Sequence, residues 1–367
     1  MELSSIILDI GLFFISILII GCLIILFLVI RYGSRTTNVV KNKDYFPSVS
    51  IVVPTMNEEK IIEKRLNNIL ELDYPQEKLE VIFVDNSKDT TFSTLLNYQD
   101  KYKIFRPIKQ ERPGFNNALN QGYSAAKGEI VVKSDVTAFT RPDALKNIVA
   151  NFYDESVGAV TGIHVFEEKN DSLEKEFKDI MYRIQKVESY FHSSLISHGS
   201  FGGYRKIIIP KLGEEITADD SEMVVSAVRH GYRAILDTSV QAFEQEPDSY
   251  SVRIEQKTRR AAGVIKVMLN SSDMFFNRKF SYFGLLTLPL DFFILIFTPV
   301  STFILLILSI AYVVLINSFY YYLGYSILMA FLILAIVFSV KVRAIFDTIL
   351  SCFLGLFKAY TKKKTWK

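Results

Sequence analysis

The sequence of 367 residues predicts an α/β domain held between membrane-spanning helices. Two runs, residues 11–30 and residues 292–340, carry no charged residue, and about 20 apolar residues are enough to cross a bilayer. Between these runs, residues 44–280 are rich in charge, and short β-branched runs alternate there with segments of helical periodicity. Such alternation is typical of a mainly parallel, mixed sheet covered by helices on both faces.

The first apolar run is expected to be a retained transmembrane anchor, followed by a basic linker, within residues 1–43. Glu2 and Asp9 precede the run, whereas Arg31 and Arg35 follow it, which is the reverse of the charge order in a signal peptide. Because cytoplasmic flanks carry the excess of Lys and Arg, the domain after this anchor is expected in the cytoplasm.

Residues 44–250 should form the α/β domain. Strands are expected at residues 49–53, 81–84, 102–105 and 130–132, with helices at 58–71, from Asp89 onward, at 116–126 and at 172–192. The last of these helices is expected to cover the sheet. Ligands of parallel sheets bind at the carboxyl ends of the strands, so the polar residues at those ends are the candidates for a site.

The second apolar run, residues 292–340, is long enough for a hairpin of two spans with a turn at Asn317 and Ser318. Residues 251–291 are expected to form interfacial helices before the hairpin, including a piece at Leu285–Leu290 that Pro289 interrupts.

The last segment, residues 341–367, is expected to hold an amphipathic interfacial helix and a basic tail. Apolar residues recur with helical spacing from Val342 to Phe357, and Asp347 lies off their stripe. A fourth span is the alternative. The tail residues Lys362–Lys364 favour the cytoplasmic side.

Polar side chains directly follow three of the predicted strands. They are Asn57 and Glu58, then Asp85 and Ser87, then Ser134 and Asp135. Turns and helix caps explain most such residues. Asp85 and Asp135 are harder to explain in this way, because a carboxylate at the end of a buried strand is costly unless it binds a donor or a cation.

Seven segments, in order along residues 48–265, together resemble the membrane-bound family 2 glycosyltransferases, whose catalytic domain has the GT-A fold. The segments are Val53-Pro54-Thr55-Met56-Asn57-Glu58, Val84-Asp85-Asn86-Ser87-Lys88-Asp89-Thr90, Arg112-Pro113-Gly114 with Ala118-Leu119-Asn120, Gly128 to Thr137, Thr217-Ala218-Asp219-Asp220, Gly231-Tyr232-Arg233, and Gln256-Lys257-Thr258-Arg259-Arg260. The resemblance implies transfer of a sugar from a nucleotide donor with inversion at the anomeric carbon.

The resemblance also implies which residues contact the nucleotide sugar. They are Pro54, Asn57, Glu58, Asp85, Ser87, Arg112, Ser134, Asp135, Gln256, Arg259 and Arg260. Within this set, Asp85 would hydrogen-bond the base or ribose, and Arg112 would lie near the diphosphate. The family usually has a Lys where this chain has Asn116, so part of the expected positive charge is missing.

Asp135 resembles the first Asp of the family's DxD motif, which implies that Mg²⁺ or Mn²⁺ binds there on the diphosphate. Thr137 stands where the second Asp usually lies, so one carboxylate remains instead of two. Mg²⁺ commonly binds through one or two carboxylates together with phosphate oxygens and waters.

The implied catalytic base is a carboxylate beside the acceptor. In the family it lies eleven residues before the Gly of a Gly-Tyr pair, and counting back from Gly231 gives Asp220, with Asp219 as the alternative. An acidic helix start favoured by the helix dipole would explain the same two residues without catalysis.

Two further segments are candidates for contact with the donor or the acceptor. Gln256, Arg259 and Arg260 resemble the QxxRW motif, with Arg260 in place of the Trp that processive synthases typically use as an aromatic platform. A basic helix touching anionic lipid is the alternative for this segment. The glycine-rich run from His198 to Arg205 is expected as a turn at the diphosphate or at the acceptor mouth.

The expected function is therefore transfer from a UDP- or GDP-sugar to a lipid-linked or membrane-proximal glycan acceptor, at the cytoplasmic face of the cell membrane, with membrane lipid as a further partner. Processive polysaccharide synthesis is the alternative. This alternative is less favoured because about three spans in a monomer leave little material for a polymer channel. A homo-oligomer would remove that objection. A second alternative is a catalytically inactive, nucleotide-binding membrane scaffold, because several of the motifs are altered.

Composition excludes other classes. The 42 Lys and Arg residues nearly balance the 39 Asp and Glu residues, so no nucleic-acid partner is expected. Cys22 and Cys352 are far apart in the sequence, in apolar segments, and neither a disulfide framework nor a cysteine metal site is expected.

Overall fold

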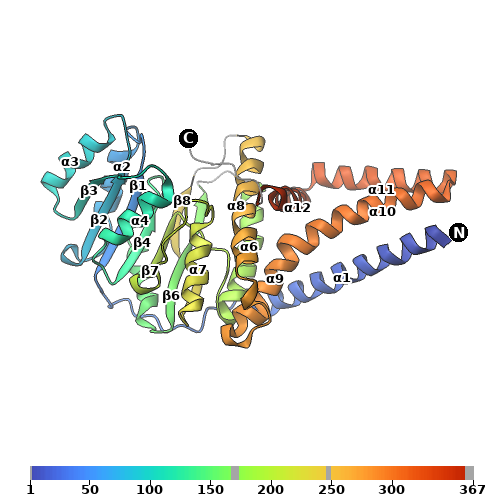
Figure 1. Cartoon of the computed structure of the whole chain (residues 1–367), viewed down its shortest axis with the longest axis horizontal. Coiled ribbons are helices and arrows are strands. Elements are labelled where there is room, and N and C mark those ends of the chain that lie inside the picture. The colour runs from blue at the N-terminus through green and yellow to red at the C-terminus, as the bar shows by residue number, and fades with distance from the viewer. Residues whose placement is uncertain (1, 167–172, 245–248, 360–367) are drawn as a thin grey trace.

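The computed structural model describes residues 2–166, 173–244 and 249–359, and it places a sheet domain at one end of three long helices (Figure 1). The eight strands are β1 Val49–Thr55, β2 Leu79–Asp85, β3 Phe105–Lys109, β4 Ile130–Ser134, β5 Phe139–Thr140, β6 Val157–Phe166, β7 Phe201–Arg205 and β8 Arg233–Glu244. Their order in the sheet is β3-β2-β1-β4-β7-β6-β8-β5. The predicted mixed sheet is confirmed: β3, β2, β1 and β4 run parallel, and β7 is antiparallel to both of its neighbours.

The register of the parallel strands aligns their carboxyl ends. Thr55 of β1 pairs with Asp85 of β2, so the polar residues that follow these strands meet at one edge. The prediction of a strand at residues 102–105 was wrong in its bounds, since β3 covers Phe105–Lys109. The strand begins at Phe105 because that residue pairs with Val81 of β2. Tyr102 instead ends α3, where its backbone N–H donates to the carbonyl oxygen of Tyr98 at 2.8 Å.

Helices cover both faces of the sheet. On one face, α2 Ile62–Leu70, α3 Thr91–Lys101 and α5 Ala144–Ala150 pack on the side chains of Val49, Ile51 and Val53. On the other face, α4 Phe115–Ala125 and α7 Asp219–Arg229 pack on the alternate side chains, including Val52 and Val84. This alternation follows from the two-residue period of a strand.

Two long helices, α6 Leu173–Phe191 and α8 Tyr250–Asn270, stand between the sheet and the long helices (Figure 1). The expectation that α6 covers the sheet accounts for part of its packing, since α6 contacts β8 but also α1 (Glu2–Tyr32) and the C-terminal helix α12 (Val340–Ala359). The helices α6 and α8 therefore lie between the sheet and the long helices.

Among the residues that the structure describes, three helices are long and apolar enough to cross a membrane. They are Leu3–Tyr32 in α1 (Glu2–Tyr32), Phe283–Ile316 and Phe319–Phe338 (α11). Most of their apolar side chains face outward, as expected for lipid contact. Asn317 takes a left-handed conformation, with φ of 48°, and makes the tight turn between α10 (Thr298–Ile316) and α11.

The second of these helices runs without the break that was expected at Pro289. Wide π-helical turns at Phe283–Thr287 and Phe293–Phe297 directly precede α9 (Leu288–Phe292) and α10, and each of those helices has a proline, Pro289 or Pro299, as its second residue. A proline ring clashes with the carbonyl of the preceding turn of an α-helix, and a wider turn relieves that clash.

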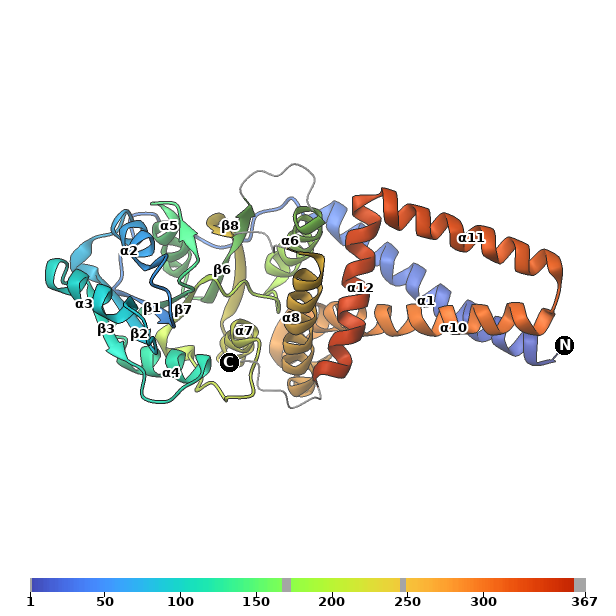
Figure 2. The same cartoon turned by 90° about the horizontal axis from the view of Figure 1, so that it is seen from above.

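The C-terminal helix α12, Val340–Ala359, runs across the three long helices rather than alongside them (Figure 2). Its small and polar side chains, including Asp347 and Ser351, are buried against α8, and Gly355 allows close approach to Ala261. Its apolar residues Ile345 and Phe357 are exposed. This arrangement fits an interfacial helix, and the tail residues Lys362–Lys364 lie outside the described residues.

Candidate active site

Asp85 lies at the end of β2 and is completely buried. Its carboxylate accepts hydrogen bonds from the hydroxyl groups of Thr55 (3.0 Å) and Ser87 (2.6 Å) and from the backbone N–H of Ser87 (3.1 Å). The ammonium of Lys109 adds an ion pair at 3.1 Å. These contacts offset the cost of burying the charge, so Asp85 is a fixed anchor for the loops at this edge.

The loop after β1 is tied to the loop after β2. The backbone N–H of Asn57 donates to the hydroxyl oxygen of Ser87 at 2.7 Å, and the N–H of Lys88 donates to Asn57 Oδ1 at 2.9 Å. Asn57 has φ of 60°, a conformation that Asn tolerates better than most residues. Pro54 lies within β1. Burial raises the pKa of Glu58, and the negative charge of Asp89 raises it further.

The two sequence positions expected near the diphosphate differ in environment. Arg112 is exposed, on the loop between β3 and α4. Asn116 is buried, and its amide donates to the carbonyl oxygens of Gly213 (2.6 Å) and Ile216 (2.8 Å). Asn116, at the position where the resemblance predicts a Lys, thus holds the segment that leads into α7.

Three acidic side chains, Asp135, Asp219 and Asp220, act electrostatically on the ammonium of Lys133. Lys133 lies on β4 with 3% of its surface exposed, and its Nζ is 2.5 Å from Asp219 Oδ2. Burial lowers the pKa of Lys133, but the nearby carboxylates of Asp219, Asp135 and Asp220 outweigh this and raise it overall. Lys133 therefore stays charged, and sequence reasoning did not single it out.

Asp220 is the first-turn neighbour of Asp219 on α7, and it is half-buried. Burial, then the charge of Asp219, raises its pKa to about 6, whereas Lys133 and Arg260 act in the opposite direction. Its Oδ1 accepts the N–H of Ser221 at 3.0 Å. A carboxylate with a pKa near neutrality is suited to accept a proton from a hydroxyl group.

Asp135 follows β4 directly and is half-buried. Its backbone N–H donates to the carbonyl oxygen of Ser200 at 2.9 Å. The preceding residue, Ser134, is buried and accepts a hydrogen bond from Nη2 of Arg65 at 2.6 Å. Burial lowers the pKa of Arg65 to about 10, and Asp135 opposes that shift, so this end of the sheet holds a second buried cation.

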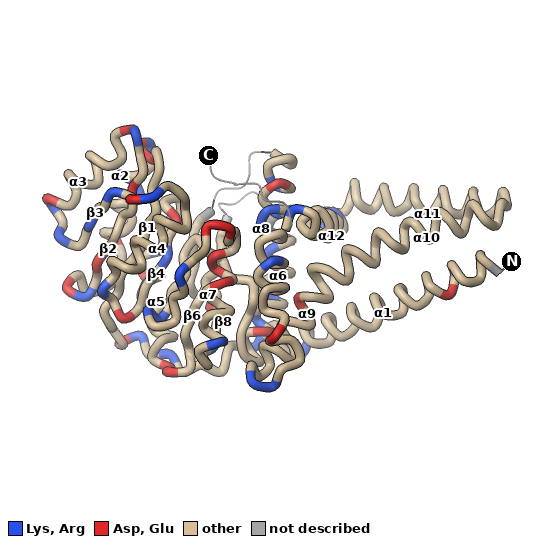
Figure 3. The backbone as a smooth tube through the Cα atoms, viewed as in Figure 1, with Lys and Arg blue, Asp and Glu red and all other residues tan. Residues whose placement is uncertain are grey.

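The QxxRR residues lie on α8, opposite the acidic start of α7 (Figure 3). Gln256 is half-buried and Arg259 is exposed. Arg260 lies near enough to lower the pKa of Asp220 through its charge. Of the three predicted residues, Arg260 is thus the one with an electrostatic link to the predicted base.

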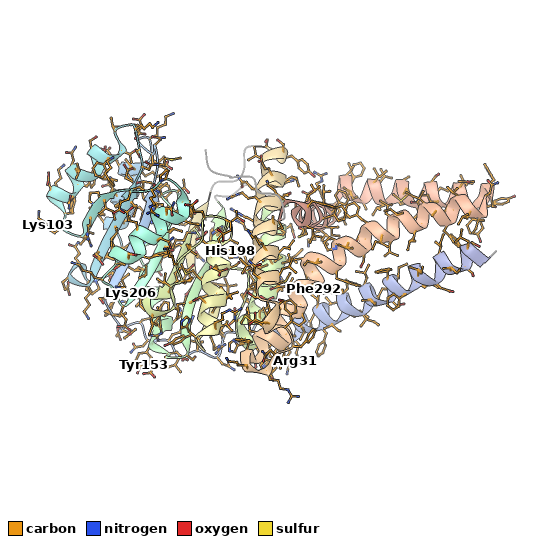
Figure 4. All side chains as sticks on the ribbon, in the orientation of Figure 1. Arg31, Lys103, Tyr153, His198, Lys206 and Phe292 are labelled. Carbon is orange, nitrogen blue, oxygen red and sulfur yellow. The ribbon has the colours of Figure 1, made fainter. Side chains whose placement is uncertain are left out.

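The glycine-rich run brings a histidine network next to these acids. Lys178 Nζ lies 3.1 Å from His164 Nδ1, and His164 Nε2 lies 2.5 Å from the hydroxyl of Ser200. An ammonium can only donate, so Lys178 donates to Nδ1 of His164. His198, labelled in Figure 4, packs its ring 5.1 Å from that of His164.

A divalent metal fits this site only together with a bound diphosphate. Among the described residues, no group of three or more His, Cys, Asp or Glu side chains could hold a metal ion. Asp135 supplies one carboxylate, and Thr137, in the place of a second, is exposed. Oxygen ligands of this type suit Mg²⁺ or Mn²⁺ when phosphate oxygens and waters complete the shell.

The predicted residues thus form two groups. Asp85, Ser87 and Asn57 are joined by hydrogen bonds, whereas Asp219 forms an ion pair with Lys133 and the charges of Asp135 and Asp220 act on the same lysine. Among the described residues no hydrogen bond or ion pair connects Arg112 with the acids of the second group. A signal for Lys133 was present in the sequence, since a Lys interrupts the apolar strand at residues 130–132 directly before Ser134 and Asp135.

Known glycosyltransferases are similar to this chain in sequence. The chain is 27% identical over 301 residues to the probable glycosyltransferase YdaM of Bacillus subtilis, a match that covers 76% of this chain and 69% of that protein. It is 40% identical over 118 residues to beta-monoglucosyldiacylglycerol synthase of Trichormus variabilis, where the match covers 31% of this chain and 25% of the relative.

The fold is also that of a solved structure, the mannosyltransferase PcManGT from Pyrobaculum calidifontis in complex with GDP-Man and Mn²⁺. The two chains superpose with a TM-score of 0.82 over 97% of this chain and 100% of the other, at 23% identity. At that identity the likeness concerns the fold.

Two family descriptions match along the chain. Residues 50–213 match glycosyl transferase family 2, and residues 135–340 match glycosyl transferase family group 2. The second match includes the acids around Lys133, the helix α8 and the membrane hairpin, and it extends over more than half of the chain. The chain therefore belongs to the family 2 group of glycosyltransferases.

Proposed function

We propose that this protein is a membrane-bound, inverting glycosyltransferase that moves a sugar from a UDP- or GDP-sugar to a lipid-linked or membrane-proximal acceptor on the cytoplasmic face. The observation that carries this proposal is the ion pair of Lys133 with Asp219, beside which Asp220 Oδ2 borders Gly199 and Asp135 acts on the same ammonium, on a domain joined to three candidate spans. Such a site holds a donor at one end and a base for an acceptor hydroxyl at the other.

We infer the roles of the residues from the family resemblance together with their positions. The loops anchored by Asp85 and Asn57 bind the nucleoside, and Arg112 and Arg260 supply cations toward the diphosphate. Asp220 accepts the proton of the acceptor hydroxyl as that oxygen attacks the anomeric carbon from the face opposite the leaving diphosphate. Asp135 would hold Mg²⁺ or Mn²⁺, which when bound neutralises charge on the diphosphate.

The acceptor is assigned to the membrane side because of α6, α8 and α12. These helices connect the acids with the candidate spans, and α8 and α12 lie against each other along their length. An acceptor carried by a lipid would reach Asp220 along this side without leaving the membrane surface. The basic linker after α1, with Arg31 and Arg35, favours a cytoplasmic domain.

The test is a screen of radiolabelled UDP-glucose, UDP-N-acetylglucosamine and GDP-mannose with membranes that contain the full chain, with and without Mg²⁺ or Mn²⁺, followed by extraction of lipid products. We expect one donor to label a lipid fraction in a metal-dependent way. A long labelled polymer would instead favour processive synthesis. No labelled product with any donor would favour the inactive scaffold.

A further inference from the structure

Lys133 is an unusual residue for its position. It belongs to β4, whose other central residues, Ile130, Val131 and Val132, are completely buried and apolar. A buried lysine is costly unless a negative charge lies within contact distance. That charge is Asp219, 86 residues later in the sequence and 2.5 Å away. The ring of Phe115, 5.1 Å from Nζ, covers another side of the ammonium.

The turn before β7 shows how tightly the charged groups are packed. A methyl group built on Gly199 would lie 2.8 Å from Lys133 Nζ and 3.1 Å from Asp220 Oδ2. Both charged atoms therefore border the small space that the missing side chain of Gly199 leaves open. A larger residue there would have to displace the ammonium, which the ion pair with Asp219 holds in place.

The two neighbouring aspartates are consequently not equivalent. Asp219 is 8% exposed and is engaged by Lys133. The hydrogen bond of Asp220 to the N–H of Ser221 uses Oδ1, and within the described residues Oδ2 accepts no hydrogen bond. Asp219 is thus held by an ion pair, whereas within the described residues Asp220 forms none and is the more exposed of the two carboxylates, so Asp220 is the one better placed to meet an incoming hydroxyl group.

We propose that Lys133 is a positioning residue that fixes Asp219 and so leaves Asp220 as the single acting base. This inference rests on the proposed function, since it assigns the division of labour within the same site. Because Lys133 acts through Asp219 and not on substrate, its removal should lower kcat and leave donor binding largely intact. A fixed Asp219 also sets the position of the first turn of α7, on which the placement of Asp220 depends.

The experiment is a double-mutant cycle on the full chain with Lys133→Met, Asp219→Asn and the combined variant. With the radiolabelled donor that the wild type uses, we expect Lys133→Met to lower kcat about 30-fold or more while the donor KM changes less than about threefold, as for loss of orientation without loss of binding. In the Asp219→Asn background the same change should lower kcat by no more than about threefold, because the partner is already gone.

Multiplicative effects of the two substitutions on kcat would overturn the inference, and so would a wild-type kcat in Lys133→Met. The exposed lysine Lys127, changed to Met, is the matched control and should transfer at the wild-type rate. If Lys133→Met does not fold, Gly199→Ala replaces it. That variant should fold with a nearly unchanged melting temperature and lose about tenfold or more in kcat, and a wild-type rate would refute the inference.

Failure of the proposed function gives a different result. A folded wild type that neither transfers nor hydrolyses any labelled donor refutes glycosyl transfer itself, and with it the role of Lys133. An active wild type with uncoupled effects of Lys133 and Asp219 refutes the positioning role alone.

Discussion

Asp85 and Asp219 are both buried carboxylates near the carboxyl ends of parallel strands, but they are held in different ways. Asp85 is bonded by Thr55, Ser87 and Lys109, which lie at most 30 residues away on neighbouring strands and loops. Asp219 is paired with Lys133, 86 residues away on the other side of the site. The edge proposed to bind the nucleotide is thus held by several contacts of shorter sequence separation, whereas Asp219, beside the proposed base, is held by one ion pair of longer separation.

The two regions should respond differently to substitution. Several polar partners share the charge of Asp85, so the loss of one leaves others in place. The acids at the start of α7 have a single ion pair, between Lys133 and Asp219, so one substitution there should disturb the geometry that the proposed transfer requires.

Asp220→Asn should give the largest effect, a loss of about 10²- to 10⁴-fold in kcat, as is typical for removal of a general base. The fold should remain intact, because the substitution removes a charge whose ionised form burial disfavours. Sugar transfer from the radiolabelled donor and thermal unfolding measure the two quantities. Asp100→Asn, at an exposed carboxylate, is the control, and equal activities of the two variants would contradict the assignment.

Asp347→Ala should destabilise the protein by about 3 kcal/mol, because breaking a buried ion pair leaves an uncompensated charge. Asp347 is completely buried in α12 and is bound by the hydroxyl of Tyr250 at 2.7 Å and by Arg253 at 2.9 Å, both on α8. Chemical denaturation of the detergent-solubilised chain measures the change.

The matched control for that variant is Asp273→Ala. It removes an exposed pair with Arg229, of 2.8 Å, that should contribute about 0–1 kcal/mol. If both variants lose the same free energy of unfolding, the buried contacts of Asp347 with Tyr250 and Arg253 are no stronger than the exposed ion pair.

Asp135→Ala should lower transfer about 100-fold and abolish stimulation by Mn²⁺, because a metal held on the diphosphate loses its protein carboxylate. Removal of metal from the wild type with EDTA should lower activity to a similar level, and added Mn²⁺ should restore it. Titration of activity against Mn²⁺ measures the effect, and a variant that responds to Mn²⁺ like the wild type would remove Asp135 from the metal site.

The pH dependence should show Asp220 losing its function in acid. Its pKa is raised to about 6, so below that pH the carboxyl group is protonated and kcat should fall about tenfold per pH unit. The free energy of unfolding should change with pH in the opposite direction to kcat. Between about pH 4 and 6 the folded state binds more protons than the unfolded state, so the contribution of Asp220 to the free energy of unfolding decreases as the pH rises through that window. A kcat that is flat from pH 7 to 5 would argue against Asp220 as the base.

Asn57→Ala should have the smallest effect, a loss of about 1 kcal/mol in stability, because Ala is disfavoured at positive φ and lacks the side-chain acceptor for Lys88. Asn57→Gly should recover part of this loss, since Gly adopts the conformation freely. Thermal unfolding compares the two variants. The donor KM should rise more than kcat falls in both, which would distinguish the nucleotide edge from the acids.

Sequence alone determined the α/β class, the positions of most of the strands that precede the site, and the three apolar spans. Each of these depends on hydrophobic periodicity and run length, which are local properties of the chain. Motif order was also sufficient to indicate the family and to select Asp85, Asp135 and Asp220. The start of β3 was misplaced because pairing with β2, rather than local hydrophobicity, decides where that strand begins.

Which charged groups come together is set by the folding of the whole chain. Lys133 on β4 meets Asp219 at the start of α7, 86 residues later in the sequence, and no spacing in the sequence encodes that contact. The same is true of Asp347, an off-stripe polar residue of α12 that packing on α8 converts into a buried clamp. Electrostatic interactions depend on distance in space and on burial, so the roles of charged residues emerge only once the chain is folded.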